Sequence, residues 1–202
     1  MPSSFGLFHV NIASLNKHIG DLKLILSLLN YKFDIIGISE HKIFKDTLPS
    51  NNIKIPGYNE FIFVPTETSH GGTGFFIKDN IDFISRKDLQ INCPSNFETI
   101  FIEVQFPKRK NLIVGCVYRH PQSNISIHDF TNLYFDPILQ KNSLENKQCI
   151  IMGDFNVDLL KIDNNEELNL FYNIISSHFF TPFILQPTRL HSKSLIDNKY
   201  VL

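Results

Sequence analysis

A strand-helix-strand unit near the start of the chain restricts the folds that this sequence can adopt. Residues 5–11 and 34–39 are short apolar runs of the kind that form buried strands. Between them, Asn16 is positioned to cap a helix over residues 17–29. The apolar side chains of that helix recur every three or four positions and form one face that must be covered: Ile19, Leu22, Ile25, Leu26 and Leu29. Such a connection favours two parallel strands whose carboxyl ends lie at the same sheet edge.

Polar side chains follow both strands of this unit. Asn11 ends the first strand and Glu40 follows the second, so we expect both at one edge of the sheet. Carboxylate and amide oxygens are suitable ligands for a hard cation. For Glu40 alone, a solvated strand end is the alternative interpretation.

A second polar pair follows an apolar run in the last third of the chain. Residues 148–152 are typical of a buried strand, which we expect to stop at Gly153. Asp154 and Asn156 come next, and in an extended chain both side chains would point to the same side. Together they could hold a hydrated magnesium ion, or orient a water molecule and a phosphate oxygen. The alternative is an Asx turn that closes the strand.

The rest of the chain continues the alternation of strands and helices. We expect an antiparallel meander over residues 81–85, 98–106 and 111–118. The basic hairpin at 107–110 is best interpreted as a solvated tip, with a contact to DNA as the alternative. Residues 126–129 resemble a capping box at the start of a helix, which Pro137 should break or restart. Residues 166–177 are predicted to form an amphipathic helix. Further short strands are predicted near 58–64 and 75–78. The segment 69–74 lacks the Lys-Ser/Thr and the helix of a P-loop, so a turn is the better interpretation.

Composition limits the location and the partners of the chain. The 202 residues suit one domain, 1–202, and contain neither a run of about 18 apolar residues nor a secretory leader, so we expect an intracellular protein without a membrane span. Because 19 Lys and Arg stand against 20 Asp and Glu, any contact with DNA must be local. Cys93, Cys116 and Cys149 lack metal-ligand spacing and are expected to be reduced packing residues.

Seven motifs in order resemble the endonuclease/exonuclease/phosphatase superfamily, and most closely the apurinic-type endonuclease domain of LINE-like (non-LTR) retrotransposons. They are Asn-Ile-x-Ser-Leu at 11–15, Asp-Ile-Ile-Gly-Ile-Ser-Glu at 34–40, Gly-Gly-x-Gly at 71–74, Val-Tyr-Arg-x-Pro at 117–121, Gly-Asp-Phe-Asn-x-Asp at 153–158, Pro-Thr-Arg at 187–189 and Leu-Ile-Asp at 195–197. The pattern alone predicts an α/β protein. The resemblance implies a four-layer α/β/β/α sandwich with two mixed sheets packed face to face, here C-terminally truncated.

The resemblance also implies a magnesium-dependent enzyme that nicks DNA, with manganese as a possible substitute. It makes Glu40 the main metal ligand with Asn11 beside it, and Asp154 the residue that orients the attacking water. It gives Asn156 and Tyr118 contacts to the phosphate, with Arg119 beside them, and Asp197 the orientation of a catalytic histidine. A nuclear location and a reverse transcriptase in the parent polyprotein are further expectations from the family.

Two departures from the family pattern affect these expectations. The family's Ser-Asp-His motif should follow some way beyond Asp197, and none of the eight histidines stands in that context. We therefore expect the terminal strands to be missing and the activity of this chain to be impaired. Ala13 also stands where the LINE-like pattern commonly has Arg. The alternative functions are a phosphatase or phosphodiesterase of the same superfamily acting on inositol lipids or other small phosphoesters, and a non-catalytic remnant.

Overall fold

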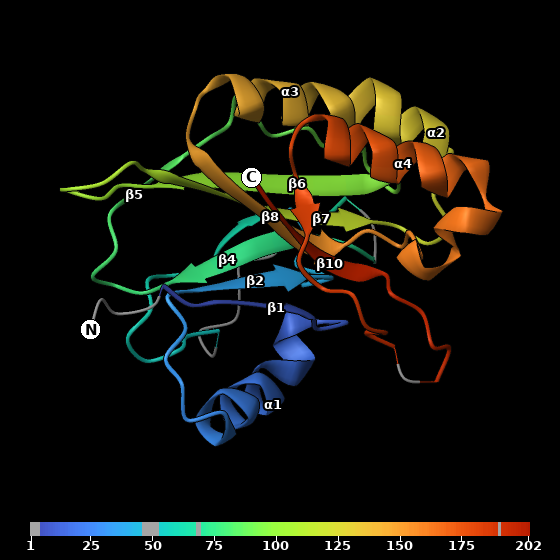
Figure 1. The fold of residues 1–202 in the computed structure, drawn as a ribbon. Helices are drawn as coiled ribbons and strands as arrows, with labels where there is room; N and C mark the ends of the chain where they lie inside the picture. The colour runs from blue at the N-terminus through green and yellow to red at the C-terminus, as the bar shows by residue number, and fades with distance from the viewer. Residues whose placement is uncertain (1–4, 46–52, 68–69, 190) are drawn as a thin grey trace.

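Two β-sheets lie face to face in the computed structural model of the chain, which describes residues 5–45, 53–67, 70–189 and 191–202 (Figure 1). The first sheet has four strands in the order β1-β2-β4-β3. β1 and β2 are parallel, as the strand-helix-strand unit predicts, and the other neighbours are antiparallel. The bounds are β1 Leu7–Asn11, β2 Ile35–Ser39, β3 Ile62–Val64 and β4 Thr73–Ile77.

The connecting helix α1, Leu15–Leu28, starts earlier than the sequence predicts. Asn16 was expected to cap it, but the position before the helix is Ser14, which makes no side-chain capping hydrogen bond. Instead, the backbone N–H of Leu15 donates to the carbonyl of His41 at 3.0 Å. A tertiary contact therefore satisfies a donor that local capping would otherwise have satisfied.

The second sheet has six strands in the order β5-β6-β7-β8-β10-β9. The first three form the predicted antiparallel meander, β7 and β8 are parallel, and β10 is antiparallel to β8. β8 does not stop at Gly153 but continues through Asp154, because Gly153 still pairs with Val117 and Asn198. The bounds are β5 Phe83–Ser85, β6 Phe97–Val104, β7 Leu112–Arg119, β8 Gln148–Asp154, β9 Thr181–Pro182 and β10 Asp197–Val201.

Helices cover the outer side of this sheet. The Ser126 hydroxyl accepts a hydrogen bond from the N–H of Asp129 and caps α2, Ile127–Asp129. A π-helical segment, Phe130–Phe135, leads into α3, Asp136–Leu144, where Pro137 stands in the first turn and restarts the helix. A 3₁₀ segment, Leu159–Asn164, precedes α4, Glu166–Ser177, whose bounds agree with the prediction.

Three separate apolar clusters fill the spaces between the four layers. One lies between α1 and the four-stranded sheet, one between the two sheets, and one between the six-stranded sheet and the helices α2, α3 and α4, in the arrangement that Figure 1 shows. The middle cluster consists of strand residues that alternate with residues facing the helices. The predicted four-layer α/β/β/α sandwich with two mixed sheets is therefore confirmed.

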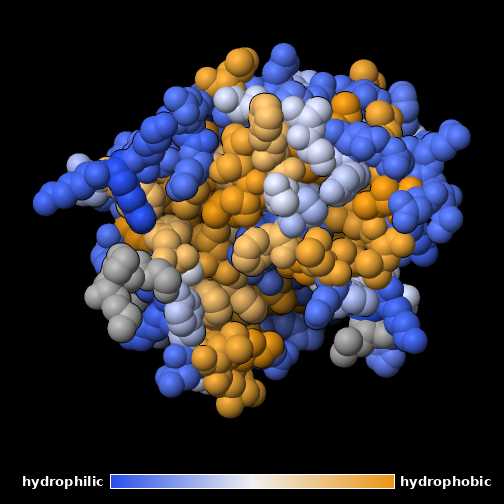
Figure 2. Space-filling view, in the orientation of Figure 1, coloured by the Kyte–Doolittle hydropathy of each residue, from blue (hydrophilic) through white to orange (hydrophobic). Residues whose placement is uncertain are grey.

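Apolar side chains also reach the surface. Figure 2 shows them over the lower end of the molecule, where α1 lies in Figure 1, and across the centre of the same face. The most exposed large apolar residues are Leu24, Leu28, Leu133, Leu144, Phe179, Phe183 and Leu185. No helix in the described parts of the chain is long and apolar enough to cross a membrane.

Candidate active site

Polar side chains replace apolar ones at one end of the space between the sheets. In the six-stranded sheet, strand register places Glu98, Tyr118, Asp154 and Asp197 side by side on four adjacent strands, β6, β7, β8 and β10. Three of them, Glu98, Tyr118 and Asp154, lie an even number of positions from an apolar residue of the middle cluster on the same strand, such as Ile100 or Met152, and so face the same way. Asp197 is in register with Asp154 on the neighbouring strand. The row therefore closes one end of the intersheet core.

The four-stranded sheet contributes the opposite side of the site. Asn11 is in register with Ser39, and Glu40 follows directly after β2. Asn11 Nδ2 donates to Glu40 Oε1 at 2.8 Å and to Asp154 Oδ2 at 2.9 Å, so one amide joins carboxylates from both sheets. The separation of those two oxygens cannot exceed the sum of the two distances. That is well within the limit of roughly 10 Å beyond which two carboxylates could not share an ion through a bridging water.

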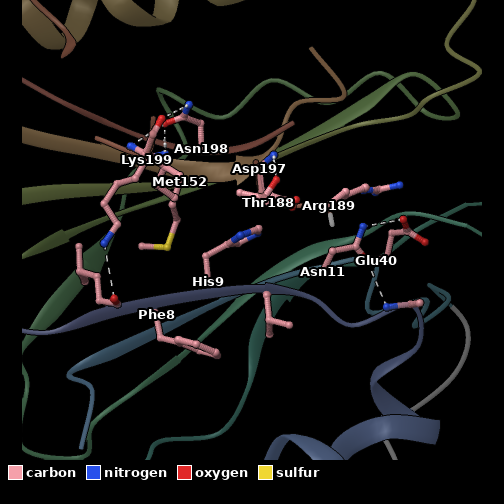
Figure 3. Close-up of a pocket in the computed structure, with 14 residues that line it drawn as sticks. Phe8, His9, Asn11, Glu40, Met152, Thr188, Arg189, Asp197, Asn198 and Lys199 are labelled. Carbon is pink, nitrogen blue, oxygen red and sulfur yellow. Dashed lines mark hydrogen bonds between the residues drawn. The ribbon is translucent and has the colours of Figure 1, made fainter. Parts of the chain in front are cut away.

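The amide of Asn11 faces the carboxylates through its nitrogen. Its Oδ1 accepts a hydrogen bond from the backbone N–H of Ala13 at 3.2 Å, which fixes this orientation because the amide nitrogen of Asn can only donate and could not accept from that N–H. Asn11 was expected to be a metal ligand. In this arrangement its nitrogen joins Glu40 and Asp154, and Figure 3 shows Asn11 beside Glu40; ligation of a metal ion by Asn11 stays a prediction.

Asp154 uses its two oxygens for different tasks. Oδ1 accepts from the backbone N–H of Asn156 at 3.1 Å, which is the Asx turn that the sequence allowed. Oδ2 faces Asn11 and accepts from Arg189 at 3.1 Å. Burial, followed by the charge of Asp197, raises the pKa of Asp154 from 3.8 to about 6 against the lowering effect of these hydrogen bonds and of Arg189. The Asx turn is therefore confirmed, and a role for Asp154 Oδ2 toward a metal ion or a water molecule stays a prediction.

Tyr118 and Glu40 form a donor-acceptor pair beside Asp154. Burial raises the pKa of Glu40, but hydrogen bonds from Asn11 and Tyr118 and the charge of Lys42 outweigh it, so that pKa lies below its ordinary value. Burial and the charge of Glu40 raise the pKa of Tyr118. The pair thus consists of an ionised carboxylate and a protonated hydroxyl, which remains available as a hydrogen-bond donor.

Asn156 and Arg119 are held by backbone carbonyls, unlike Tyr118 and Glu40, which bond to each other. Asn156 adopts a left-handed backbone, φ 49°, and its Nδ2 donates to the Arg119 carbonyl at 2.6 Å, so one of its two amide hydrogens is already in use. Arg119 is only 6% exposed, and its guanidinium donates to the Ile125 carbonyl and lies over the Phe130 ring. The expected phosphate contact by Arg119 does not fit this position, because its guanidinium is buried under the helices.

Asp197 stands at the outer end of the polar row. Burial raises its pKa, while a hydrogen bond from Thr188 and the charge of Arg189 act in the opposite direction. Among the residues that the structure describes, no histidine donates a hydrogen bond to Asp197. The role that the resemblance gives this carboxylate therefore has no partner in the described ranges.

A cavity of about 780 Å³ opens beside the site, between β1 and β10. Asn11, Glu40, Arg189 and Asp197 line one end of it, as Figure 3 shows. At the other end Lys199 crosses from β10 and donates to the Leu7 carbonyl at 3.5 Å. The space between is lined by Phe8, His9, Val10, Met152 and Ile184.

The donor set suits a magnesium ion that keeps most of its water. Magnesium is usually held by one or two carboxylates and several waters. Glu40 and Asp154 supply the carboxylates, which the Asn11 amide nitrogen joins. Within the residues that the structure describes, no three His, Cys, Asp or Glu side chains come close enough to form a complete protein ligand set. These residues therefore fit a hydrated ion and not a fully protein-bound one.

Sequence reasoning missed two contributors to the site. Arg189 was quoted only as part of a motif, yet its guanidinium supplies the positive charge on Asp154. Glu98 was placed in a strand without a role, yet it belongs to the polar row and pairs with His120 at 3.0 Å. Period-two alternation could have identified Glu98, because it is a charged residue on the face that carries Ile100, Ile102 and Val104.

Comparisons with known proteins agree with this architecture. Among solved structures, an AP endonuclease from Leishmania major is 14% identical with a TM-score of 0.67, and covers 98% of this chain and 78% of that one. The human Nocturnin catalytic domain is 16% identical, TM-score 0.65, at 98% and 81% coverage. A 3'-5' exonuclease from Neisseria meningitidis is 13% identical, TM-score 0.60, at 98% and 86% coverage. At these identities the likeness concerns the fold.

A family model provides the assignment that these structures cannot. None of the curated proteins compared with the chain matches it. The model of the Endonuclease/Exonuclease/phosphatase family matches residues 9–192, which include every member of the polar row except Asp197. The chain belongs to the Endonuclease/Exonuclease/phosphatase family.

Proposed function

We propose that this chain is a magnesium-dependent phosphodiesterase that nicks DNA, of the type found in LINE-like retrotransposons. The observation that carries the proposal is the Asn11 amide, which joins Glu40 and Asp154 across the two sheets. Such a bridge concentrates ionisable oxygens in one pocket beside a protonated Tyr118. A phosphodiester is cleaved by positioning a water molecule and by stabilising charge, and these are the tasks that such groups perform.

Asp154 is the base in this proposal. With its pKa raised to about 6, the carboxylate is mostly ionised near neutral pH and is a better proton acceptor than an ordinary aspartate. Asn156 holds Oδ1 of Asp154 through its backbone N–H, so Oδ2, which now accepts from Asn11 and Arg189, is the oxygen left to accept from a water molecule. A water bound at that second oxygen would lose its proton to Asp154 as it attacks phosphorus, while the bond from phosphorus to the 3′ oxygen breaks and the Tyr118 hydroxyl donates to that leaving oxygen.

Tyr118, Asn156 and Arg189 supply donors to the phosphate. The Tyr118 hydroxyl remains protonated and can donate to a phosphate oxygen, and the second amide hydrogen of Asn156 is directed away from the Arg119 carbonyl. Arg189 is 48% exposed and can exchange its bond to Asp154 for one to an anion. Magnesium or manganese bound at Glu40 would add charge stabilisation for the scissile phosphate.

The choice of DNA rests on sequence detail. The segments at 34–40, 117–121 and 187–197 carry the LINE-like form of the family motifs. A net charge of −1 restricts DNA contacts to the neighbourhood of the site. A nuclear location and a reverse transcriptase in the parent polyprotein remain parts of this proposal.

A supercoiled-plasmid assay tests the proposal. The chain is incubated with magnesium beside Asp154→Asn, Glu40→Gln and the control Glu103→Gln, whose carboxylate faces away from the site in an ion pair with Arg86. In keeping with the impaired activity expected from the sequence, we expect slow nicking by the wild type, the same rate in the control, and no nicking above background in the two site variants. Phosphate release from inositol phosphates without nicking would favour the small-phosphoester alternative, and no activity on either substrate would favour a non-catalytic remnant.

A further inference from the structure

Glu98 is a buried carboxylate in the polar row that the proposed chemistry does not use. It is 4% exposed and lies next to Tyr118 in the strand register. His120 Nε2 lies 3.0 and 3.1 Å from its two oxygens, and the backbone N–H of Gly72 donates to Oε2 at 3.4 Å. A buried carboxylate that keeps such partners fixes the groups that donate to it.

The turn at Gly71 and Gly72 is closed onto this pair. Both glycines have left-handed backbones, with φ values of +89° and +93°. A Cβ on Gly71 would lie 2.7 Å from both Glu98 Oε1 and His120 Nε2, and a Cβ on Gly72 would collide with the His41 ring. Glycine is therefore required at both positions by the backbone angle and by the close approach.

The same turn supports the segment that carries Glu40. The Gly71 carbonyl accepts from the backbone N–H of Lys42 at 3.0 Å, and the buried His41 ring lies against Gly72. Glu40 and Lys42 both have left-handed backbones, φ 54° and 55°. This conformation is costly for residues with a Cβ and persists only where the surroundings hold it.

His120 also connects Glu98 to Tyr118. The two rings have centroids 4.7 Å apart. Tyr118 in turn donates to Glu40. Glu98 and His120 therefore support Tyr118 by direct contact and support Glu40 indirectly, through the glycine turn. A remote ionic network on the same strand, Glu103 with Arg86 and Lys147, has no such connection to the site.

We propose that Glu98 and His120 are positioning residues, which hold the glycine turn against the Glu40 segment and the Tyr118 ring in place. The reaction they serve is the proposed one, so this inference rests on the proposed function for its consequence and on the contacts above for its geometry. Loss of the pair should loosen residues 40–42, weaken divalent cation binding and lower kcat more than it raises KM.

Two substitutions at one position separate positioning from packing. His120→Gln keeps an N–H near the place of Nε2 and should preserve the bond to Glu98, whereas His120→Leu removes the donor and leaves the carboxylate buried without it. Glu98→Gln tests the pair from the other side if His120→Leu does not fold. Glu103→Gln is the matched control, a buried carboxylate on the same strand.

The first measurement is hydrogen exchange of the Lys42 and Gly72 amides in the protein alone, and the second is manganese affinity. We expect His120→Leu and Glu98→Gln to raise exchange at both amides and to weaken manganese binding by roughly tenfold or more, as losses of outer-shell support do. His120→Gln and Glu103→Gln should resemble the wild type in both. Unchanged exchange at Lys42 in both His120→Leu and Glu98→Gln would overturn the inference, and so would equal changes in Glu103→Gln.

Nicking by the same set of proteins separates this inference from the proposed function. If the wild type does not nick DNA, the proposed function fails while the exchange data still decide the positioning role. If the wild type nicks and His120→Leu does so with the same kcat, the proposed function stands and the inference fails. A fall in kcat restored by His120→Gln supports both.

Discussion

The raised pKa of Asp154 means that its ionisation lowers the free energy of unfolding at neutral pH. The carboxylate is fully buried, and its pKa is raised from 3.8 to about 6 by burial and by Asp197. A shift of this size corresponds to about 3 kcal/mol. Since the folded pKa lies above the unfolded one, this contribution to stability is fully present below the unfolded pKa and is lost as pH rises through about 6.

Asp154→Asn removes the charge and therefore the pH-dependent contribution of this residue to the free energy of unfolding. The variant places an amide beside the Asn11 nitrogen, which costs about 1–3 kcal/mol at every pH because two donors face each other. The difference in unfolding free energy between variant and wild type should therefore move in favour of the variant by about 3 kcal/mol from below pH 4 to above pH 7. Urea denaturation in EDTA across this range measures it.

In the control Glu103→Gln, the pH dependence of the stability difference has the opposite sign. Burial raises the pKa of Glu103, but Lys147, Asn111 and Arg86 outweigh it and lower that pKa below its ordinary value. The stabilisation that ionised Glu103 provides is present above its unfolded pKa and is lost as pH falls. The free energy of unfolding of Glu103→Gln should therefore decrease relative to that of the wild type as pH rises. A variant-minus-wild-type difference for Asp154→Asn that stays constant with pH, or moves in the Glu103 direction, would refute the argument.

Two further predictions concern packing. Gly153→Ala should destabilise the protein by about 3 kcal/mol or more, because the new Cβ would overlap the Val117 carbonyl oxygen in the neighbouring strand; an unchanged thermal midpoint would contradict it. Cys116 and Cys149 are buried, and burial raises the pKa of both thiols, to about 12 for Cys116, so iodoacetamide should modify the native protein at Cys93 first; equal labelling of all three would show that these strands open readily.

Periodicity in the sequence predicted the elements that build the sandwich. The strand-helix-strand unit, the meander and α4 follow from apolar spacing, because packing and local preference agree in those segments. The end of β8 could not be predicted in the same way. Gly153 favours a turn locally, but pairing with Val117 and Asn198 on both sides extends the strand through Asp154.

The site residues divide in the same manner. Asn11, Glu40, Tyr118, Asp154 and Asp197 were expected together, and strand register brings them to one end of the intersheet space. Arg119 follows Tyr118 directly, so period-two geometry places it on the opposite face, toward Phe130. The rotation of the Asn11 amide depends on the backbone N–H of Ala13, a contact that no spacing of residue types reveals.

The central claim is that Glu40 and Asp154 form one site for a divalent cation. Titration with manganese, followed by the electron paramagnetic resonance signal of the free ion, tests it most directly on the wild type, Glu40→Gln and Glu103→Gln. We predict one weak site in the wild type, of submillimolar to millimolar affinity, retained in Glu103→Gln and lost in Glu40→Gln. Equal binding by the wild type and Glu40→Gln, or no binding by the wild type, would contradict the claim and leave Asp154 with its Asx turn alone.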